Sequence, residues 1–329
     1  MLRKDLQAKK RHHYVWAHYL ARWGNGTKNV FYTTKTGKIA HDSVRAIAVE
    51  DYFYKTTILT KKHIDIIKGF SRQSPEHLQK QHMSHLNDFL KIQHAETIYH
   101  MSGRSSQEAE ALLHATKCNL IENLHSSHET AALKVLTALA DEQLDILQDK
   151  QHMLEFMIFI GHQIVRTKAY RDGVLRILHR RSTLEIEVAD AISHAWWFLS
   201  YMFGMNIGFS LFIGRHDSRH ALLVNDTNIP FITSDHPVVN VHSCVSETEY
   251  CVPEHADFYY PISPSIAYII CDSERFTPGI HSVDKVMVNE FNTKVATQAM
   301  VHIIGDTDDV IFPLKAHIGL RYDKSNSAS

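Results

Sequence analysis

Two adjacent histidines, His12 and His13, stand in the segment of this chain that is richest in reactive groups. The segment reads RHHYVWAHYLARW over residues 11–23 and combines imidazole, guanidinium and aromatic side chains. Imidazole changes charge near neutral pH and, when neutral, binds metal ions. The pair therefore predicts a site of acid–base catalysis or metal binding. The alternative, in which both rings hydrogen-bond to a neighbouring sheet, stays open.

Two further segments place polar side chains in apolar surroundings. Gln163 and Arg166 lie three residues apart at the end of the segment 153–165, which is apolar nearly all round and predicts a central helix. A buried guanidinium needs a partner, and Asp235 or a bound phosphate would supply one. Asp235 follows an apolar strand in a Thr-Ser-Asp-His-Pro turn, where a side chain can point into a cleft.

We therefore predict that these groups converge on one catalytic site. In a phosphodiester-cleaving enzyme, imidazole would remove a 2′-hydroxyl proton and arginine would stabilise the developing negative charge, so RNA is the favoured substrate. The alternative is a structural role, with an Arg166–Asp235 ion pair and Asp235 capping its own turn. The predicted catalytic residues are His12, His13, Gln163, Arg166 and Asp235.

The motifs present in the sequence limit which metal ions and cofactors the chain could bind. A divalent metal, if used, would be bound by His12, His13, Asp235 and His236. The chain contains no HExxH, Walker, GxGxxG or zinc-ribbon motif, so no nucleotide cofactor is expected. The second functional class is a non-catalytic sensor or interaction module, in which helices of residues 61–150 bind a partner and the polar cluster is structural.

The order of the predicted helices and strands that position these residues indicates an α+β fold. Residues 29–33 and 38–40 flank a hairpin-like turn, apolar stripes at helical spacing run from about 61 to 202, and short strand-like segments follow 205. The β-rich ends are expected to form one mixed sheet around the helical region. The predicted regions are 1–60, 61–204 and 205–323, with a tail at 324–329.

The uncharged segment 195–214 is long enough to cross a bilayer. Gly204, Asn206 and Gly208 interrupt it, and its second half alternates small or polar residues with apolar ones. This pattern predicts a buried helix end, a turn near Gly204 and then a strand. No membrane association is expected, and no signal-peptide pattern is visible at the start.

Composition is balanced, with 35 Lys and Arg against 36 Asp and Glu, so net charge does not indicate a nucleic-acid-binding protein. Basic stretches at residues 1–13 and 166–181 could meet phosphate or form solvated faces. The four cysteines form no CxxC pair, which favours a reducing cytoplasm. Many of the 25 histidines lie on helical, polar-looking stretches, and most of these are expected at the surface. They are His77, His82, His85, His94, His100, His114, His125 and His128.

At the level of motifs, the opening HHYVWAHYLARW resembles the HHYVPxxYLxxF start of a bacterial family catalogued as a domain of unknown function, number 4238. Residues 159–167 are similar to its FxxxQxxRT helix, residues 231–238 to its FITSDxPV segment, residues 260–264 to its PLSP stretch, and residues 288–292 to a late helix with asparagine. Trp16 departs from the proline of the family pattern.

The resemblance covers nearly the whole chain and implies an effector of antiphage defence that is toxic or senses damage. The implied partners are RNA or a phage component, with further copies of the chain as a homo-oligomer. From the matched segments, the candidate substrate-binding residues are Tyr14, Tyr19, Arg22 and Asn292.

Overall fold

The computed structural model describes residues 6–178, 181–246 and 252–322, and its architecture is α+β. A helical layer fills the middle of the chain and strands lie toward both ends, as predicted. The predicted tail at 324–329 lies outside the described residues. The helices are α1 (Ala17–Leu20), α2 (Lys61–Ser71), α3 (Glu76–Met101), α4 (Gln107–Ala140), α5 (Lys150–Val165), α6 (Lys168–Ile177), α7 (Thr183–His194), α8 (Trp196–Ile213), α9 (Lys285–Gln298) and α10 (Asp308–Ile311).

The strands form three sheets in the described part of the chain, so the expectation of one mixed sheet is wrong. A two-stranded sheet pairs β1 with β4, a five-stranded sheet has the order β10-β5-β9-β8-β7, and a four-stranded sheet has the order β3-β2-β11-β6. The strands are β1 (Arg11–His13), β2 (Asn29–Thr33), β3 (Ile39–Ser43), β4 (Val49–Asp51), β5 (Arg219–Val224), β6 (Thr233–Ser234), β7 (Val239–Asn240), β8 (Asp257–Pro261), β9 (Ile266–Cys271), β10 (Gly279–Ser282) and β11 (Ile303–Gly305).

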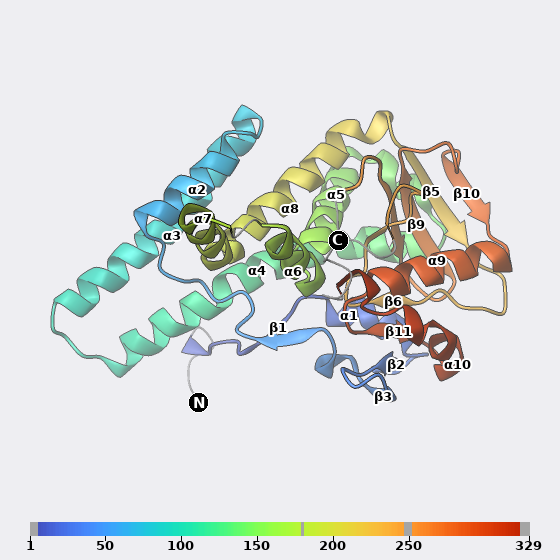
Figure 1. Cartoon of the computed structure of the whole chain (residues 1–329), viewed down its shortest axis with the longest axis horizontal. Coiled ribbons are helices and arrows are strands. Elements are labelled where there is room, and N and C mark those ends of the chain that lie inside the picture. Colours follow the sequence, from blue (N-terminus) through green and yellow to red (C-terminus); the bar gives the residue numbers. More distant parts are fainter. Residues whose placement is uncertain (1–5, 179–180, 247–251, 323–329) are drawn as a thin grey trace.

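Strands β8 and β9, in the middle of the five-stranded sheet, are buried on both faces. In β9, Tyr268 belongs to the core shared with the helical layer, whereas its neighbour Ile269 belongs to the core shared with α9. This alternation follows from the two-residue period of a strand. The sheet therefore lies between the helical layer and α9 (Figure 1).

Helices α5 and α8 cross closely through three glycines. A Cβ atom on Gly161 would lie 2.4 Å from the carbonyl oxygen of Gly204 and 2.4 Å from the backbone nitrogen of Gly208. The prediction of a turn and a strand within 195–214 is wrong, because α8 is continuous and uses these glycines for close contact with α5. The window Trp196–His216 could cross a membrane by length and composition, but 56% of it is buried inside the fold, as in the core helix of a soluble protein.

Helices α3 and α4 form a long antiparallel hairpin whose distal half, residues 90–114, extends away from the body (Figure 1). Its turn is fixed by Tyr99, whose hydroxyl accepts a hydrogen bond from the Ser106 backbone at 2.8 Å and donates one to the Ser106 carbonyl at 3.2 Å. No residue between 90 and 114 is buried. We call residues 90–114 the arm.

Candidate functional site

Three of the segments that carry the family resemblance, residues 11–23, 159–167 and 231–238, meet near Arg166, which directly follows α5. Its side chain is 2% exposed, and each of its three nitrogens donates a hydrogen bond. Nη1 binds Glu129 Oε1 at 2.6 Å, Nη2 binds the His13 carbonyl at 2.6 Å, and Nε binds the Tyr54 hydroxyl at 3.2 Å. The expected ion pair with Asp235 is therefore wrong, because Glu129 of α4 is the partner.

Burial and the neighbouring acidic groups shift the pKa of Arg166 in opposite directions. Burial alone disfavours a charged guanidinium, but Tyr54, Glu129 and Glu122 raise the pKa of Arg166. Burial also raises the pKa of Glu129, and the nearby Arg166 opposes that shift. Three of its five N–H groups are bonded within the protein and the side chain is 2% exposed, so little of this guanidinium is open to a phosphate.

His12 is wholly buried and both of its ring nitrogens are bonded to backbone. Nδ1 accepts a hydrogen bond from the Tyr54 backbone at 2.9 Å, so Nε2 carries the proton and donates to the Lys9 carbonyl at 3.0 Å. The ring also stacks on Tyr54, with centroids 5.7 Å apart. Burial lowers the pKa of His12, which keeps the ring neutral. These contacts fix the start of the chain against the loop after β4.

His13 is half-buried and meets Arg166 through its backbone carbonyl, not through its ring. Its ring atom Nε2 is buried without a hydrogen-bond partner. Burial lowers the pKa of His13, and the charges of Arg11 and Arg166 lower it further. His13 thus lies beside the predicted arginine but has no described carboxylate against its ring.

The Asp235 carboxylate, just after β6, accepts hydrogen bonds from three backbone N–H groups. Its Oδ1 accepts from the Met300 backbone at 2.9 Å, and its Oδ2 accepts from Val301 at 2.8 Å and His302 at 3.0 Å. Burial raises the pKa of Asp235, while His302 and these three backbone groups oppose the rise. The carboxylate thus connects β6 to the segment entering β11.

His236 links this turn to the helical layer. Its Nδ1 lies 2.8 Å from the hydroxyl of Thr167, the residue that follows Arg166 and caps the start of α6. Burial lowers the pKa of His236 to about 3. The segments that hold His13, Arg166 and Asp235 are therefore adjacent, but they are joined through backbone and neighbouring residues. The convergence of these side chains on one catalytic site stays a prediction.

The predicted metal set does not assemble in the described residues. His12 and Asp235 use their ligating atoms on backbone groups, and the described histidines, cysteines, aspartates and glutamates form no group of three suited to a metal ion. Gln163 is 1% exposed, and neither its amide oxygen nor its amide nitrogen has a partner.

Three of the four predicted substrate-binding residues make internal hydrogen bonds. The Tyr19 hydroxyl donates to the Pro261 carbonyl at 2.7 Å, Arg22 reaches the Leu136 carbonyl at 3.4 Å, and Asn292 accepts from the Ile232 backbone at 3.0 Å. Tyr14 is buried against Phe53, with ring centroids 5.4 Å apart. These residues tie the opening segment and α9 to neighbouring loops and strands.

A cluster of buried and half-buried histidines between α4, α5 and α8 was missed by the sequence reasoning. His162 stacks on His128 at 4.5 Å and meets His125 edge-on at 5.2 Å, with Tyr201 of α8 completing the contact at 5.0 Å from His162. The expectation that most of the named histidines are exposed fails for His125 and His82, which are buried, and for His85 and His128, which are half-buried.

These histidines are held neutral. Burial lowers the pKa of His128 to about 4 and those of His125 and His162 well below the ordinary value, and the charge of Arg166 contributes to all three shifts. The available signal was the spacing of Glu122, His125 and Glu129, which places them on one face of a long helix. That face also carries buried apolar residues, which should have indicated burial.

The same region concentrates buried polar atoms that lack partners within the protein. Of fourteen such side-chain atoms in the described residues, eight lie around Arg166 and the histidine cluster. They are His13 Nε2, Glu122 Oε2, both ring nitrogens of His125, His162 Nδ1, both amide atoms of Gln163 and the Tyr260 hydroxyl.

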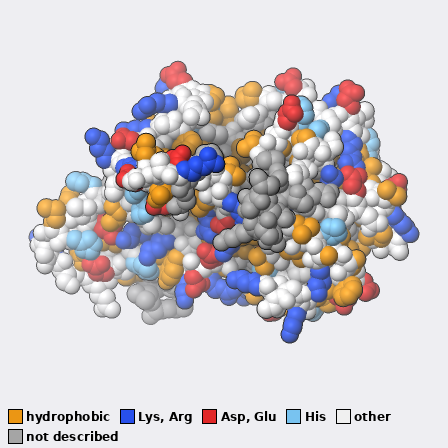
Figure 2. Space-filling view, viewed as in Figure 1, with side chains coloured by type: hydrophobic (Ala, Val, Ile, Leu, Met, Phe, Trp, Pro, Cys, Tyr) orange, Lys and Arg blue, Asp and Glu red, His pale blue; other side chains and the backbone are white. Residues whose placement is uncertain are grey.

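Some cations of the basic stretches are paired with carboxylates where the structure describes them. Lys168 pairs with Glu50 at 2.7 Å, and Arg171 pairs with Asp172 at 2.8 Å. Arg3, Lys4 and Arg180 lie outside the described residues. On the face seen in Figure 2, Lys and Arg side chains are interspersed with Asp and Glu, so this face presents no extended field of positive charge.

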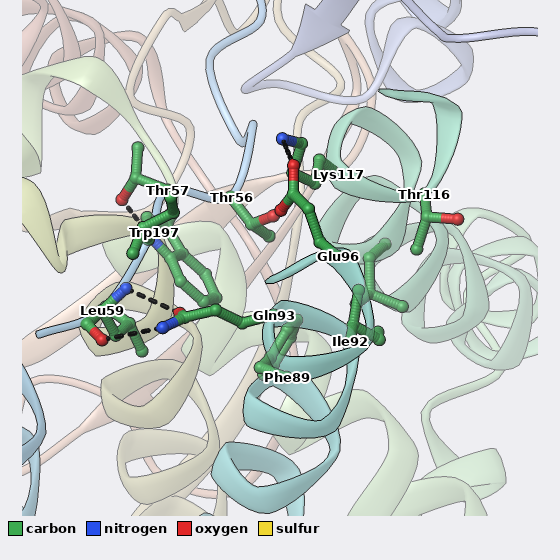
Figure 3. Close-up of a pocket in the computed structure, with 12 residues that line it drawn as sticks. Thr56, Thr57, Leu59, Phe89, Ile92, Gln93, Glu96, Thr116, Lys117 and Trp197 are labelled. Carbon is green, nitrogen blue, oxygen red and sulfur yellow. Dashed lines mark hydrogen bonds and ion pairs between the residues drawn. The ribbon is translucent and has the colours of Figure 1, made fainter. Parts of the chain in front are cut away.

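A small crevice between residues 56–59, α3, α4 and α8 is lined by paired polar groups (Figure 3). The Gln93 amide exchanges two hydrogen bonds with the Leu59 backbone, at 2.8 and 3.1 Å, and Trp197 donates to Thr57 at 2.9 Å. Lys117 and Glu96 form an ion pair at its edge. Its open space of about 20 Å³ suits roughly one water molecule. The crevice therefore secures residues 56–59 against α3, α4 and α8.

Comparison with known proteins gives one match. The model of a family described as protein of unknown function (DUF4238) matches residues 11–208 and 212–309. Neither the curated proteins nor the solved structures contain a match to this chain.

Proposed function

We propose that this chain, which belongs to the DUF4238 family, is a cytoplasmic sensor or interaction module of antiphage defence. In this proposal the arm recognises a protein partner, and the polar residues around Arg166 form a structural clamp. The observation that carries it is the bonding of Arg166 to Glu129, Tyr54 and His13 at 2% exposure. A catalytic arginine would need donors directed at substrate.

The arm supplies the surface for a partner. Helices in proteins gain most of their stability by packing an apolar face against other elements. The arm nevertheless exposes 54% of Ile98 and 82% of Met101, which lie three residues apart and so on the same side of α3. Flexible, polarizable methionine is common on surfaces that bind protein partners.

The test compares paired surface variants in a plaque assay on cells that express the chain. Ile98→Ser with Met101→Ser should reduce protection at least tenfold while the melting temperature stays unchanged. The matched control is Ile280→Ser with Val286→Ser, because these exposed apolar residues lie away from the arm. The control should protect as the wild type does.

Three outcomes would contradict the proposal. The first is full protection by the arm variant, and the second is no protection by the wild type. The third is RNA cleavage by the purified wild type that His13→Ala abolishes without changing the melting temperature. That result would favour the phosphodiesterase alternative, with imidazole as the general base.

A further inference from the structure

A groove on the far side of the sheet from the helical layer belongs neither to the clamp nor to the arm. Its walls are α9, the loop 228–230 and the segment from Asp306 through α10 to His317. It holds about 720 Å³ of open space, which lies in the range of ligand-binding pockets, about 300–1,000 Å³. Asn292 positions one wall, because its amide donates to the Pro230 carbonyl at 2.9 Å.

The carboxylates that line the groove make it acidic. Asp306 and Asp309 line it, and no described lining residue is a lysine or arginine. A phosphate-bearing ligand would therefore meet carboxylates without a compensating cation. A ligand with amine or guanidinium groups would meet hydrogen-bond acceptors of opposite charge, which are the stronger kind.

Asp306 offers an acceptor that the protein leaves unused. Its Oδ1 atom is buried and has no hydrogen-bond partner, and burial raises the pKa of this carboxyl. A buried oxygen of this kind is costly unless a donor meets it. Because Asp306 lines the groove and is only partly buried as a residue, rotation of its carboxylate would let a cationic N–H group in the groove supply that donor.

The remaining lining suits a peptide. Val310 and Leu314 are buried apolar residues at the base of α10 and the turn that follows, and can contact the aliphatic part of a long side chain. Asn228 and Asn289 add amide groups that can pair with peptide backbone. We infer that this groove binds a peptide segment bearing arginine or lysine.

The experiment is calorimetric titration of the full chain with a blocked peptide that contains two arginines. The analogue with citrulline in place of arginine keeps the shape and removes the charge. The arginine peptide should bind at least tenfold more tightly than the citrulline peptide. Asp309→Asn should weaken binding about tenfold, as expected for one lost charge-assisted hydrogen bond.

Asn289→Arg places a positive charge in the groove and should abolish binding. Asp65→Asn is the matched control, because Asp65 is an exposed carboxylate on α2, at the other end of the molecule in Figure 1. It should bind as the wild type does. Asp306→Asn removes the other carboxylate of the groove. If its melting temperature is unchanged, it should also bind the arginine peptide more weakly than the wild type does.

Three outcomes would overturn the inference. They are equal affinity for the arginine and citrulline peptides, unchanged affinity in Asp309→Asn, and binding of spermidine without binding of peptide. None of them bears on the arm, whose variants leave this groove intact, so the two proposals can fail separately.

Discussion

Arg166 joins three elements that lie far apart in the sequence. One side chain contacts β1, the loop after β4 and the middle of α4 through His13, Tyr54 and Glu129. A planar guanidinium suits this task because its donors point in fixed directions, which a lysine ammonium cannot reproduce. The pattern QxxRT therefore marks a structural junction in this chain.

Replacing Arg166 should destabilise the protein strongly. Arg166→Ala leaves Glu129 buried without its partner, and such a change costs about 3–5 kcal/mol of unfolding free energy. Arg166→Lys should recover little, because one ammonium cannot bind all three partners. Lys168→Ala removes a more exposed pair with Glu50 and should cost at most about 1 kcal/mol. Urea denaturation measures the unfolding free energy of all three variants. A loss of about 1 kcal/mol or less in Arg166→Ala would contradict the structural role proposed for this residue.

The buried histidines should make stability depend on pH. Burial lowers the pKa values of His125 and His162, so only the unfolded chain binds their protons as the pH falls below about 6.5. The free energy of unfolding should then fall by about 1.4 kcal/mol per pH unit for each such histidine. This stability is present above pH 6.5 and is lost progressively toward the lowered folded-state values.

The measurement is urea denaturation at pH 7.5, 6.5 and 5.5. His125→Phe removes one titrating ring and keeps its approximate shape, so its stability should depend less steeply on pH than that of the wild type. The difference between the two chains is the quantity to compare, because the raised pKa values of Glu122 and Glu129 act in the opposite direction. His94→Gln, at an exposed site, should leave the slope unchanged; a matching change there would contradict the assignment.

At the scale of elements, the α5–α8 crossing depends on the absence of side chains. Gly161→Ala should cost about 1–3 kcal/mol or more, because its Cβ would meet the backbone of α8, which cannot rotate away. Gly69→Ala on α2 is the matched control. Nothing lies within 4 Å of its added Cβ, so better helix propensity should stabilise the protein by up to about 1 kcal/mol. Thermal melting of both variants distinguishes a packing effect from a propensity effect.

Local patterns predicted most of the elements. Helical stripes identified the middle of the chain, and the turn at 34–37 identified the β2–β3 hairpin, because both depend on neighbours in sequence. The division into three sheets depends on partners far apart in sequence, such as β2 with β11. The same limit applies to the site, because nothing near Arg166 in sequence indicates that Glu129 is its partner. Gly204 suggested a turn because the helix that it contacts was not known.

Across the whole molecule, one core connects the predicted regions. Trp23, Trp197 and Tyr260 belong to the same buried cluster, although they come from the first, second and third of the predicted regions. Trp23 is further fixed by its indole, which donates to the Phe231 carbonyl at 2.8 Å. A contiguous cluster of this kind usually marks one domain, so none of the three regions is expected to unfold without disturbing the others.

We therefore expect one unfolding transition. In a chain whose other tryptophans are phenylalanine, the fluorescence of Trp23 reports the strand layer, and far-ultraviolet circular dichroism reports mainly the helices. Their denaturation midpoints should coincide. An earlier fluorescence transition would mean that residues 1–60 unfold as a separate unit.

The four-stranded sheet also has a consequence during translation. Strand β2 leaves the ribosome together with β3, but its other partner is in β11, and Ile303 follows Thr33 by 270 residues. At about 5–20 residues per second, β11 arrives roughly 15–55 s later. During that interval one side of β2 has no native strand beside it, and an unpaired edge can pair with another nascent chain on the same message. The arrival of β11 ends this exposure, so the last quarter of the chain protects the first strands from aggregation.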